Sequence, residues 1–531
     1  MIEGGRHAPP YVEFVTMKQK IFALALVLGL MLLPGVAPQA QAQPGAAIIY
    51  VPDDYPTIQG AVNASSPGDT IIVGDGNYTE NIAVTVDHLT IKSQNGAGST
   101  VVAAADPYTD IFDVRVEHVS ISGFTVTGAT GKYQAGIYLT GDGYCDIHDN
   151  TVLDNYYGIL VEYSYNNTLT NNTAKGNSLD GIIVGLSGNN TLTGNTANEN
   201  DYFGIRLYFS APNTLRNNSM ADNRCNFYSW SMEYSELRQD VDTSNTVDGR
   251  PVYLLLDRSD EVIDSSTNAG YVDIINSTNI TVKDLNITHS GHGVLFAFTN
   301  NSRIENVTGC YDKHSFLLYE SHNNTVVNNI AANNIYDGFR LWNSTDNILL
   351  NNTSNWNAYG TVLDSSDNNT LINNSFSNSS QWGILVRDSN NNAIYLNDVV
   401  DNPQGCSVLS ASSTSSANIA DIWNSTEKLT YSYNGANYTG YLGNYWGDYQ
   451  ASYPGAAEVG STGVGDTPYG IQTTDHAVPQ ADSHPLVAPV SHYLVTGKPT
   501  GAASPWLHRY WWTLVAVLII ALLLYFLKKS K

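Results

Sequence analysis

Three side chains that can bind a metal ion recur at an almost constant interval. His292, His314 and Asp337 are 22 and 23 residues apart. If repeats of that length stack as neighbouring strands, these side chains lie about 5 Å from one another. Imidazole and carboxylate groups are common metal ligands, so this column is the candidate metal site. The alternative is that all three are solvated turn residues without a ligand.

Other members of the same column are aromatic. They are Tyr157, Phe203, Tyr359 and Trp382. Exposed aromatic surfaces often mark binding sites, and flat rings can stack on sugar rings. This edge is therefore the candidate carbohydrate-binding surface. The alternative is coincidence, because the chain contains 34 tyrosines.

Side chains that could catalyse sugar cleavage are present but scattered. Sugar lyases need an acidic calcium site and a base, and hydrolases need paired carboxylates. No three acids occupy matching positions of adjacent repeats beside an Arg or Lys, so the sequence favours binding over catalysis. The candidate acids and bases are Glu162, Asp180, Asp201, Asp364, Asp388, Arg206, Arg340 and Arg387.

A constant period of 22 or 23 residues predicts the elements that position these side chains. Gly136, Gly158, Gly181 and Gly204 mark one block of repeats, and a second block begins at Gly293. Apolar residues recur one and three positions after nearly every marker, and aliphatic residues recur eleven positions after it. Short alternating runs indicate strands, and no helical periodicity is present. Stacked short strands of constant period predict an all-β parallel β-helix.

An asparagine recurs fourteen residues after almost every marker. An inward-pointing turn leaves backbone groups unpaired, and an amide both donates and accepts hydrogen bonds. We expect these residues to form a structural ladder: Asn150, Asn172, Asn195, Asn218, Asn329, Asn352, Asn374 and Asn397.

The two ends of the chain predict export and anchoring. Residues 17–42 contain a basic start, an apolar stretch and a small-residue cleavage site. Residues 510–528 contain an apolar run with aromatic residues at one boundary and lysines at the other. We expect a single-pass membrane protein with an extracellular ectodomain. Between these segments we expect a cap and first turns (43–135), regular turns (136–226), irregular turns (227–292), regular turns (293–430), a C-terminal cap (431–486) and a spacer (487–509).

Composition limits the partners. Acidic residues outnumber basic residues by 49 to 24, giving a net charge of −25. No basic surface is therefore expected for nucleic acid. We expect Cys145, Cys225, Cys310 and Cys406 to be free or partly buried thiols. No cofactor is fixed by the sequence, and in the cap Asp448, Asp466 and Asp475 are candidate calcium ligands without EF-hand spacing.

Several motifs resemble a known family. Residues 50–59 (YVPDDYPTIQ) and 67–80 resemble the opening of archaeal surface β-helix proteins. Residues 241–253 (VDTSNTVDGRPVY), 443–449 (GNYWGDY) and 465–469 (GDTPY) are similar to segments of the NosD-type β-helix family. The resemblance implies a right-handed, single-stranded, pectate-lyase-like solenoid outside the cytoplasm, in a superfamily that includes carbohydrate-binding proteins and sugar hydrolases.

The resemblance also implies alternatives for function. The namesake of the family assists copper-centre maturation of nitrous oxide reductase, which makes copper a candidate ligand here. The chain has no Met- or Cys-rich cluster suited to copper(I). We therefore expect a binding or structural role at the cell envelope, with a polysaccharide or glycoprotein as partner. The alternatives are a polysaccharide lyase, hydrolase or epimerase, and a copper-handling accessory protein.

Overall fold

The computed structural model describes residues 46–141, 143–409, 420–473 and 479–496. These residues form an all-β solenoid of about 16 turns whose successive turns pair in parallel, which confirms the predicted parallel β-helix. The predicted signal segment (17–42) and transmembrane segment (510–528) lie outside the described residues. Within the described ranges, no helix is long and apolar enough to span a bilayer.

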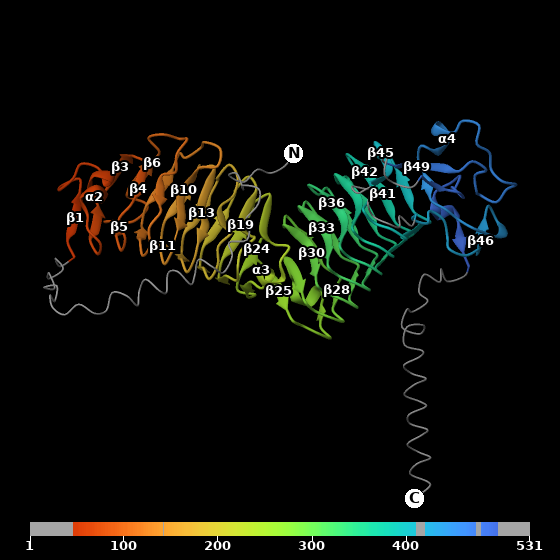
Figure 1. The fold of residues 1–531 in the computed structure, drawn as a ribbon, viewed down its shortest axis with the longest axis horizontal. Coiled ribbons are helices and arrows are strands. Elements are labelled where there is room, and N and C mark those ends of the chain that lie inside the picture. The colour runs from red at the N-terminus through yellow and green to blue at the C-terminus, as the bar shows by residue number, and fades with distance from the viewer. Residues whose placement is uncertain (1–45, 142, 410–419, 474–478, 497–531) are drawn as a thin grey trace, which may run out of the picture.

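The solenoid consists of two stacks of turns that meet at an angle (Figure 1). The first stack has three parallel sheets. One contains, in order, β4 (Ile82–Val84), β7 (Phe112–Val114), β10 (Ala135–Gly141), β13 (Tyr157–Ser164), β16 (Ile182–Gly185), β19 (Phe203–Tyr208) and β22 (Cys225–Trp230). The second contains β1 (Ile48–Val51), β2 (Thr70–Val73), β5 (Thr90–Ser93), β8 (Ser120–Ser122), β11 (Asp146–His148), β14 (Thr168–Thr170), β17 (Thr191–Thr193), β20 (Thr214–Arg216) and β23 (Asp240–Val241), and the third contains β3 (Gly76–Thr79), β6 (Thr100–Ala103), β9 (Thr125–Thr127), β12 (Thr151–Leu153), β15 (Thr173–Lys175), β18 (Thr196–Asn198), β21 (Ser219–Ala221) and β24 (Thr246–Val247).

The second stack repeats this arrangement. Its three sheets contain β25 (Arg250–Leu256), β27 (Tyr271–Ile275), β30 (His292–Ala297), β33 (His314–Tyr319), β36 (Asp337–Trp342), β39 (Tyr359–Asp364), β42 (Trp382–Arg387) and β45 (Gln404–Leu409); β26 (Val262–Ile263), β28 (Thr281–Lys283), β31 (Arg303–Glu305), β34 (Thr325–Val327), β37 (Ile348–Leu350), β40 (Thr370–Ile372) and β43 (Ala393–Tyr395); and β29 (Asn286–Thr288), β32 (Thr308–Cys310), β35 (Ile330–Ala332), β38 (Thr353–Asn355), β41 (Ser375–Ser377), β44 (Asp398–Val400) and β48 (Tyr445–Trp446).

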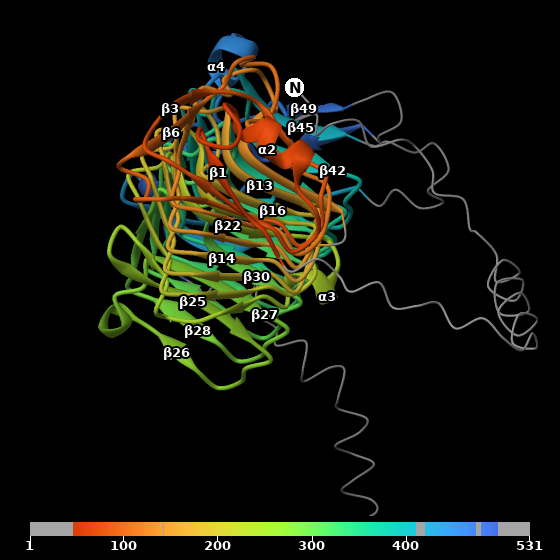
Figure 2. The ribbon, with the colours of Figure 1, turned by 90° about the vertical axis from the view of Figure 1, so that its left-hand side faces the viewer.

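Both ends of the solenoid carry additional elements. The helix α2 (Ile58–Ala64) lies over the N-terminal end, where Thr57 caps it (Figure 2). Near the C-terminal end are the helix α4 (Tyr449–Ser452), the antiparallel sheet of β46 (Leu429–Tyr433), β47 (Ala436–Gly440) and β51 (Leu494–Val495), and the antiparallel pair β49 (Tyr469–Thr473) and β50 (Gln480–Asp482). These elements give the exposed strand edges at the ends of the stack a cover or a partner.

Aliphatic side chains stack in register inside each stack. Ile137, Ile159, Ile182 and Ile205 pair across four successive strands, and none has exposed surface. Burial of such a side chain contributes about 1.5–3 kcal/mol. Because each turn buries its apolar face only against its neighbours, stability is shared between adjacent turns.

Asparagine side chains fill one corner of each stack. Asn150, Asn172 and Asn195 each donate from Nδ2 to the amide oxygen of the next asparagine, at 2.9–3.1 Å. Each also donates to a backbone carbonyl, as Asn195 does to Leu169 at 2.8 Å. The same arrangement joins Asn329, Asn352, Asn374 and Asn397 in the second stack. These amides satisfy the backbone of the buried turns.

The first stack ends against the outer face of the second. The backbone N–H of Gly291 donates to the carbonyl of Phe227 at 2.8 Å, and Tyr319 donates to the carbonyl of Met232 at 2.9 Å. Outward side chains of the second stack, Leu295 and Leu317, belong to the apolar core of the first. The predicted break in the repeat at 227–292 coincides with this change of direction, which includes the short helix α3 (Tyr234–Leu237).

Candidate functional site

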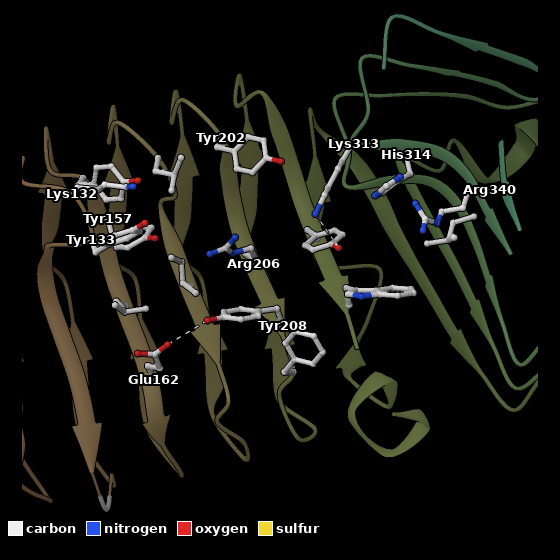
Figure 3. A pocket seen from close by; sticks show the side chains of 18 of the residues that line it. Lys132, Tyr133, Tyr157, Glu162, Tyr202, Arg206, Tyr208, Lys313, His314 and Arg340 are labelled. Atoms are coloured by element: carbon white, nitrogen blue, oxygen red, sulfur yellow. Dashed lines mark hydrogen bonds between the residues drawn. The ribbon is translucent and has the colours of Figure 1, made fainter. Parts of the chain in front are cut away.

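A cleft of about 580 Å³ lies in the angle between the two stacks. Outward side chains of β13, β16, β19 and β22 form one part of it, and residues of β33 and β36 form the other (Figure 3). We refer to it as the junction cleft, lined by Lys132, Tyr133, Tyr156, Tyr157, Leu160, Glu162, Leu179, Ile183, Tyr202, Arg206, Tyr208, Phe209, Tyr228, Trp230, Lys313, His314, Leu317, Arg340 and Trp342.

Aromatic rings lie at both ends of the junction cleft and, with Tyr208, between them. Tyr133 and Tyr156 meet edge to face, with ring centroids 5.9 Å apart. At the other end Trp230 of the first stack and Trp342 of the second lie 5.8 Å apart and nearly parallel, at 24°. Aromatic side chains provide a large apolar face together with a polar edge. Such a lining suits a ligand with both apolar faces and hydroxyl groups.

An arginine in the cleft is held by a buried carboxylate. The guanidinium of Arg206 lies 3.1 Å from Asp180, whose side chain has no exposed surface. Asp180 in turn accepts a hydrogen bond from the backbone N–H of Phe203 at 3.0 Å. The guanidinium also lies over the ring of Tyr208, at 4.9 Å. These contacts fix a cationic donor at the surface of the cleft.

Tyr208 connects this arginine to the acidic side chain in the lining. Its hydroxyl donates to Glu162 Oε1 at 3.3 Å. Burial, together with the neighbouring Glu162, raises the pKa of Tyr208 to about 12. Tyr208 therefore remains a neutral phenol at physiological pH and keeps its proton as a donor.

On the second stack, a histidine is oriented by a buried aspartate. His314 Nδ1 lies 2.8 Å from Asp337 Oδ2, and Asp337 has no exposed surface. Burial lowers the pKa of His314 to about 4, against the opposing effect of Asp337. The neutral imidazole therefore donates from Nδ1, which leaves Nε2 with a lone pair. Within the part of the chain that the structure describes, Nε2 has no hydrogen-bond partner.

A second arginine shares this aspartate. Arg340 lies 3.3 Å from Asp337 and 2.9 Å from Asp364, which also pairs with Arg387 at 2.7 Å. Burial alone would raise the pKa of Asp337, but His314 and Arg340 lower it below its ordinary value. The carboxylate is therefore charged, and it holds both side chains in place.

The structure separates the four aromatic residues predicted to bind sugar. Tyr157 lines the junction cleft, whereas Phe203 is fully buried and stacks on Tyr228 at 4.9 Å. Tyr359 and Trp382 are half-buried and stack on each other at 5.7 Å and 4°, outside the cleft. The predicted column therefore does not form one continuous exposed surface.

The predicted metal column is likewise divided. His314 pairs with Asp337, but His292 is fully buried and lies 3.5 Å from Asp273 instead. The alternative of solvated turn residues does not fit His292 and Asp337, whose side chains have no exposed surface. Among the described residues, no three His, Cys, Asp or Glu side chains are grouped to hold a metal.

Other candidate ligands are also dispersed. Cys145, Cys225, Cys310 and Cys406 are free thiols, as predicted. Asp448 accepts from Tyr469 at 3.0 Å, and Asp466 accepts from the backbone N–H of Ala457 at 3.0 Å. Asp475 lies outside the described residues.

The candidate acids and bases meet only in part. Glu162, Asp180, Arg206 and Arg340 gather at the junction cleft, while Asp364 lies behind Arg340. Tyr208 and Trp342, each four positions after a marker, line the cleft although the sequence did not indicate them as candidates. A signal was available, because the second position after the marker is apolar in several repeats although it points outward. Its members include Leu160, Ile183, Leu295 and Leu317.

A protein-family profile matches most of the chain. The profile described as "Periplasmic copper-binding protein (NosD)" matches residues 62–241 and 238–451, which is most of the solenoid. The chain belongs to the NosD family. This confirms the predicted family and supports the right-handed sense that the resemblance implied. No curated protein matches this NosD-family chain.

Solved structures similar to this NosD-family protein are carbohydrate-active β-helix proteins. The A-module of Azotobacter vinelandii mannuronan C-5 epimerase AlgE4 is 17% identical, covering 70% of this chain and 91% of its own, with a TM-score of 0.31. Pectate lyase Pel9A is 17% identical over 58% and 77%, with a TM-score of 0.30. The GH87 α-1,3-glucanase from Streptomyces thermodiastaticus is 14% identical over 73% and 67%, with a TM-score of 0.30. Such distant matches carry no argument about activity.

The copper in the family description does not fit the described residues. Copper sites in proteins use grouped imidazole, thiolate or thioether ligands. Here the cysteines are isolated from one another, and His292 and His314 are engaged with separate aspartates.

Proposed function

We propose that this NosD-family protein binds a carbohydrate in the junction cleft, as part of a binding or structural role at the cell envelope. The observation that carries the proposal is the aromatic-rich lining of a cleft of about 580 Å³ that also presents fixed polar side chains. Small-molecule sites are typically concave, largely apolar and equipped with a few polar groups that set orientation. An aromatic ring packs on the C–H face of a sugar, while the neighbouring polar groups bind its hydroxyls.

The shape of the cleft suits a chain of sugars better than one sugar. It crosses several adjacent strands of the first stack before it reaches the second (Figure 3). The turns of β13, β19 and β22 each contribute rings, and successive turns lie about 4.8 Å apart. A polysaccharide laid across the turns can therefore contact several rings at once. The export and anchor segments expected from the sequence would place this surface outside the membrane, facing envelope polymers.

A glycan array probed with the full-length protein tests the proposal. We expect binding of at least one glycan class by the wild type, and its loss in the double variant Tyr208→Ala/Trp342→Ala. The matched control is Tyr359→Ala/Trp382→Ala, which removes a stacked aromatic pair outside the cleft. Equal loss in both double variants, or loss only in the second, would contradict the assignment to the junction cleft.

A second function is favoured by the His314–Asp337 pair. A neutral imidazole that is oriented by a buried carboxylate and opens to a binding cleft can accept a proton from a bound sugar. Removing such a proton begins elimination or epimerisation. Incubation of the array ligand with wild type and His314→Gln, followed by mass spectrometry and NMR of the glycan, tests this function. An altered glycan with the wild type alone supports catalysis, and an unchanged glycan with both proteins contradicts it.

A further inference from the structure

We infer that the ligand of the junction cleft is an anionic polysaccharide, bearing carboxylate or sulfate groups. This inference rests on the proposed function and assigns the chemical class of its ligand. The inference rests on the charged side chains of the lining and on how far each of these side chains and its partner is buried.

The lining reverses the charge balance of the protein. The whole chain has 49 acidic and 24 basic residues. The lining contains four Lys or Arg residues, Lys132, Arg206, Lys313 and Arg340, and a single carboxylate, that of Glu162. Local excess of one charge attracts ligands of the opposite charge, and the low-dielectric walls of a cleft strengthen the effect. The excess of acidic residues in the rest of the chain disfavours binding of a polyanion outside the cleft.

The acidic partners of the arginines lie beneath the surface. Asp180 and Asp337 have no exposed surface, whereas the side chains of their partners Arg206 and Arg340 are 15% and 19% exposed. An incoming ligand therefore meets guanidinium donors rather than carboxylates. The buried carboxylates also hold the guanidinium groups in fixed orientations. A pre-oriented guanidinium suits the two oxygens of a carboxylate or sulfate.

The lysines lie at opposite ends of the aromatic lining. Lys132 is exposed beside Tyr133, just before β10, and its ammonium group lies 4.6 Å from the centre of that ring. Lys313 Nζ lies 3.2 Å from the hydroxyl of Tyr228 on β22 and 4.4 Å from the centre of the same ring. Four inter-strand spacings separate β10 from β22, which corresponds to roughly 19 Å. A single small anion cannot reach both ends, but a charged polymer can.

A further cation lies between the two lysines. Arg206 sits on β19 between them, with Tyr208 two residues further along the same strand. A polymer that carries several anionic groups can therefore contact Lys132, Arg206 and Lys313 along its length.

The inference is tested by titrating the full-length protein with three polymers: polygalacturonate, the same polymer after reduction of its carboxyl groups, and dextran sulfate. The variant is Lys132→Gln/Lys313→Gln. The control is Lys92→Gln/Lys175→Gln, which makes the same change in net charge at exposed positions of the first stack, on β5 and β15. Each titration is run at two salt concentrations.

We expect one or both anionic polymers to bind, the carboxyl-reduced polymer to bind at least about tenfold more weakly, and salt to weaken binding. The cleft variant should lose about tenfold or more in affinity, and the control less than about twofold. Preference for polygalacturonate or for dextran sulfate identifies the anionic group, and either one supports the inference. Equal binding of the reduced polymer, with no effect of the cleft variant, would overturn it and leave carbohydrate binding intact. Failure of every polymer and of the glycan array would overturn both proposals.

Discussion

The ammonium group of Lys313 lies 3.2 Å from the phenolic oxygen of Tyr228, although 85 residues separate them and they belong to different stacks. Tyr228 is on the last regular strand of the first stack, and Lys313 immediately precedes β33 of the second. The contact therefore crosses the floor of the junction cleft. Because each stack contributes part of the lining, the site exists only where the solenoid changes direction.

Removing one ring of the lining should weaken glycan binding without unfolding the protein. Trp342 is half-buried and stacks on Trp230 at 5.8 Å. We expect Trp342→Ala to reduce affinity for the array ligand by roughly three- to tenfold, because one stacked aromatic contact contributes about 0.5–1.5 kcal/mol. Calorimetric titration measures the change. Tyr108→Ala, at an exposed ring on the first stack, is the control, and an equal loss there would contradict the prediction.

Removing one amide of the asparagine ladder should destabilise the first stack. Asn195 Nδ2 donates to Leu169 O at 2.8 Å and to Asn218 at 2.9 Å, and its Oδ1 accepts from Asn172 at 3.0 Å. Asn195→Ala leaves these buried groups unpaired, at about 1–3 kcal/mol for each one that water cannot reach. We expect a loss of about 2–4 kcal/mol by urea unfolding. Thr168→Ala, at an exposed strand position, should change the unfolding free energy by less than about 0.5 kcal/mol; similar losses in the two variants would argue against the ladder.

A buried polar cluster at the junction should also contribute to stability. The hydroxyl of Tyr271 donates to Asp273 at 2.7 Å, and His292 lies 3.5 Å from the same carboxylate, with all three side chains fully buried. Tyr271→Phe removes one donor from that carboxylate and should cost about 1–3 kcal/mol. Thermal unfolding measures the loss. Tyr253→Phe on the neighbouring strand β25, where the ring is half-buried, is the control and should be nearly neutral.

His314, the histidine of the junction cleft, should make the free energy of unfolding decrease as pH falls. Burial lowers the pKa of His314 from 6.5 to about 4 in the folded protein. Between these values the unfolded chain binds a proton that the folded protein does not, so the stabilisation present above pH 6.5 is lost as pH falls towards 4. The loss amounts to about 3 kcal/mol. His314→Gln should therefore flatten this part of the profile.

The difference between the two profiles isolates His314. The pKa of Asp421 and that of Asp482 are each raised by burial to about 6, so those carboxyls favour the folded state as pH falls from 6. Their contribution has the opposite sign but is the same in wild type and variant. Urea unfolding at pH 7, 5.5 and 4.5 gives the comparison. Parallel profiles for the two proteins would show that His314 is not buried in its neutral form.

Much of the fold can be predicted from the sequence because every turn repeats the same residue pattern. Ile159 and Ile182 occupy the same position of successive turns, so their spacing gives both the strand period and the inward face. The asparagine at positions 172 and 195 recurs for the same reason, because each buried corner needs an amide. Local repetition does not encode the angle between the stacks. That angle depends on contacts such as Gly291 with Phe227, which are 64 residues apart.

The candidate site was therefore harder to predict than the fold. Alignment by column placed Phe203 beside Tyr157 as an exposed ring, yet Phe203 is fully buried and stacks on Tyr228 of the neighbouring strand. His292 was grouped with His314 for the same reason, although docking encloses it beside Asp273. Tyr208 and Trp342 occupy the same position of the repeat in different stacks. They line one cleft only because the two stacks dock.

The most direct test of the account is hydroxyl-radical footprinting of the full-length protein with and without the glycan found on the array. It reports solvent protection at individual aromatic side chains. We predict that the ligand protects Tyr208, Trp230 and Trp342 and leaves the exposed Tyr108 unchanged. Protection of Tyr359 and Trp382 without protection of Trp342 would contradict the assignment of carbohydrate binding to the junction cleft.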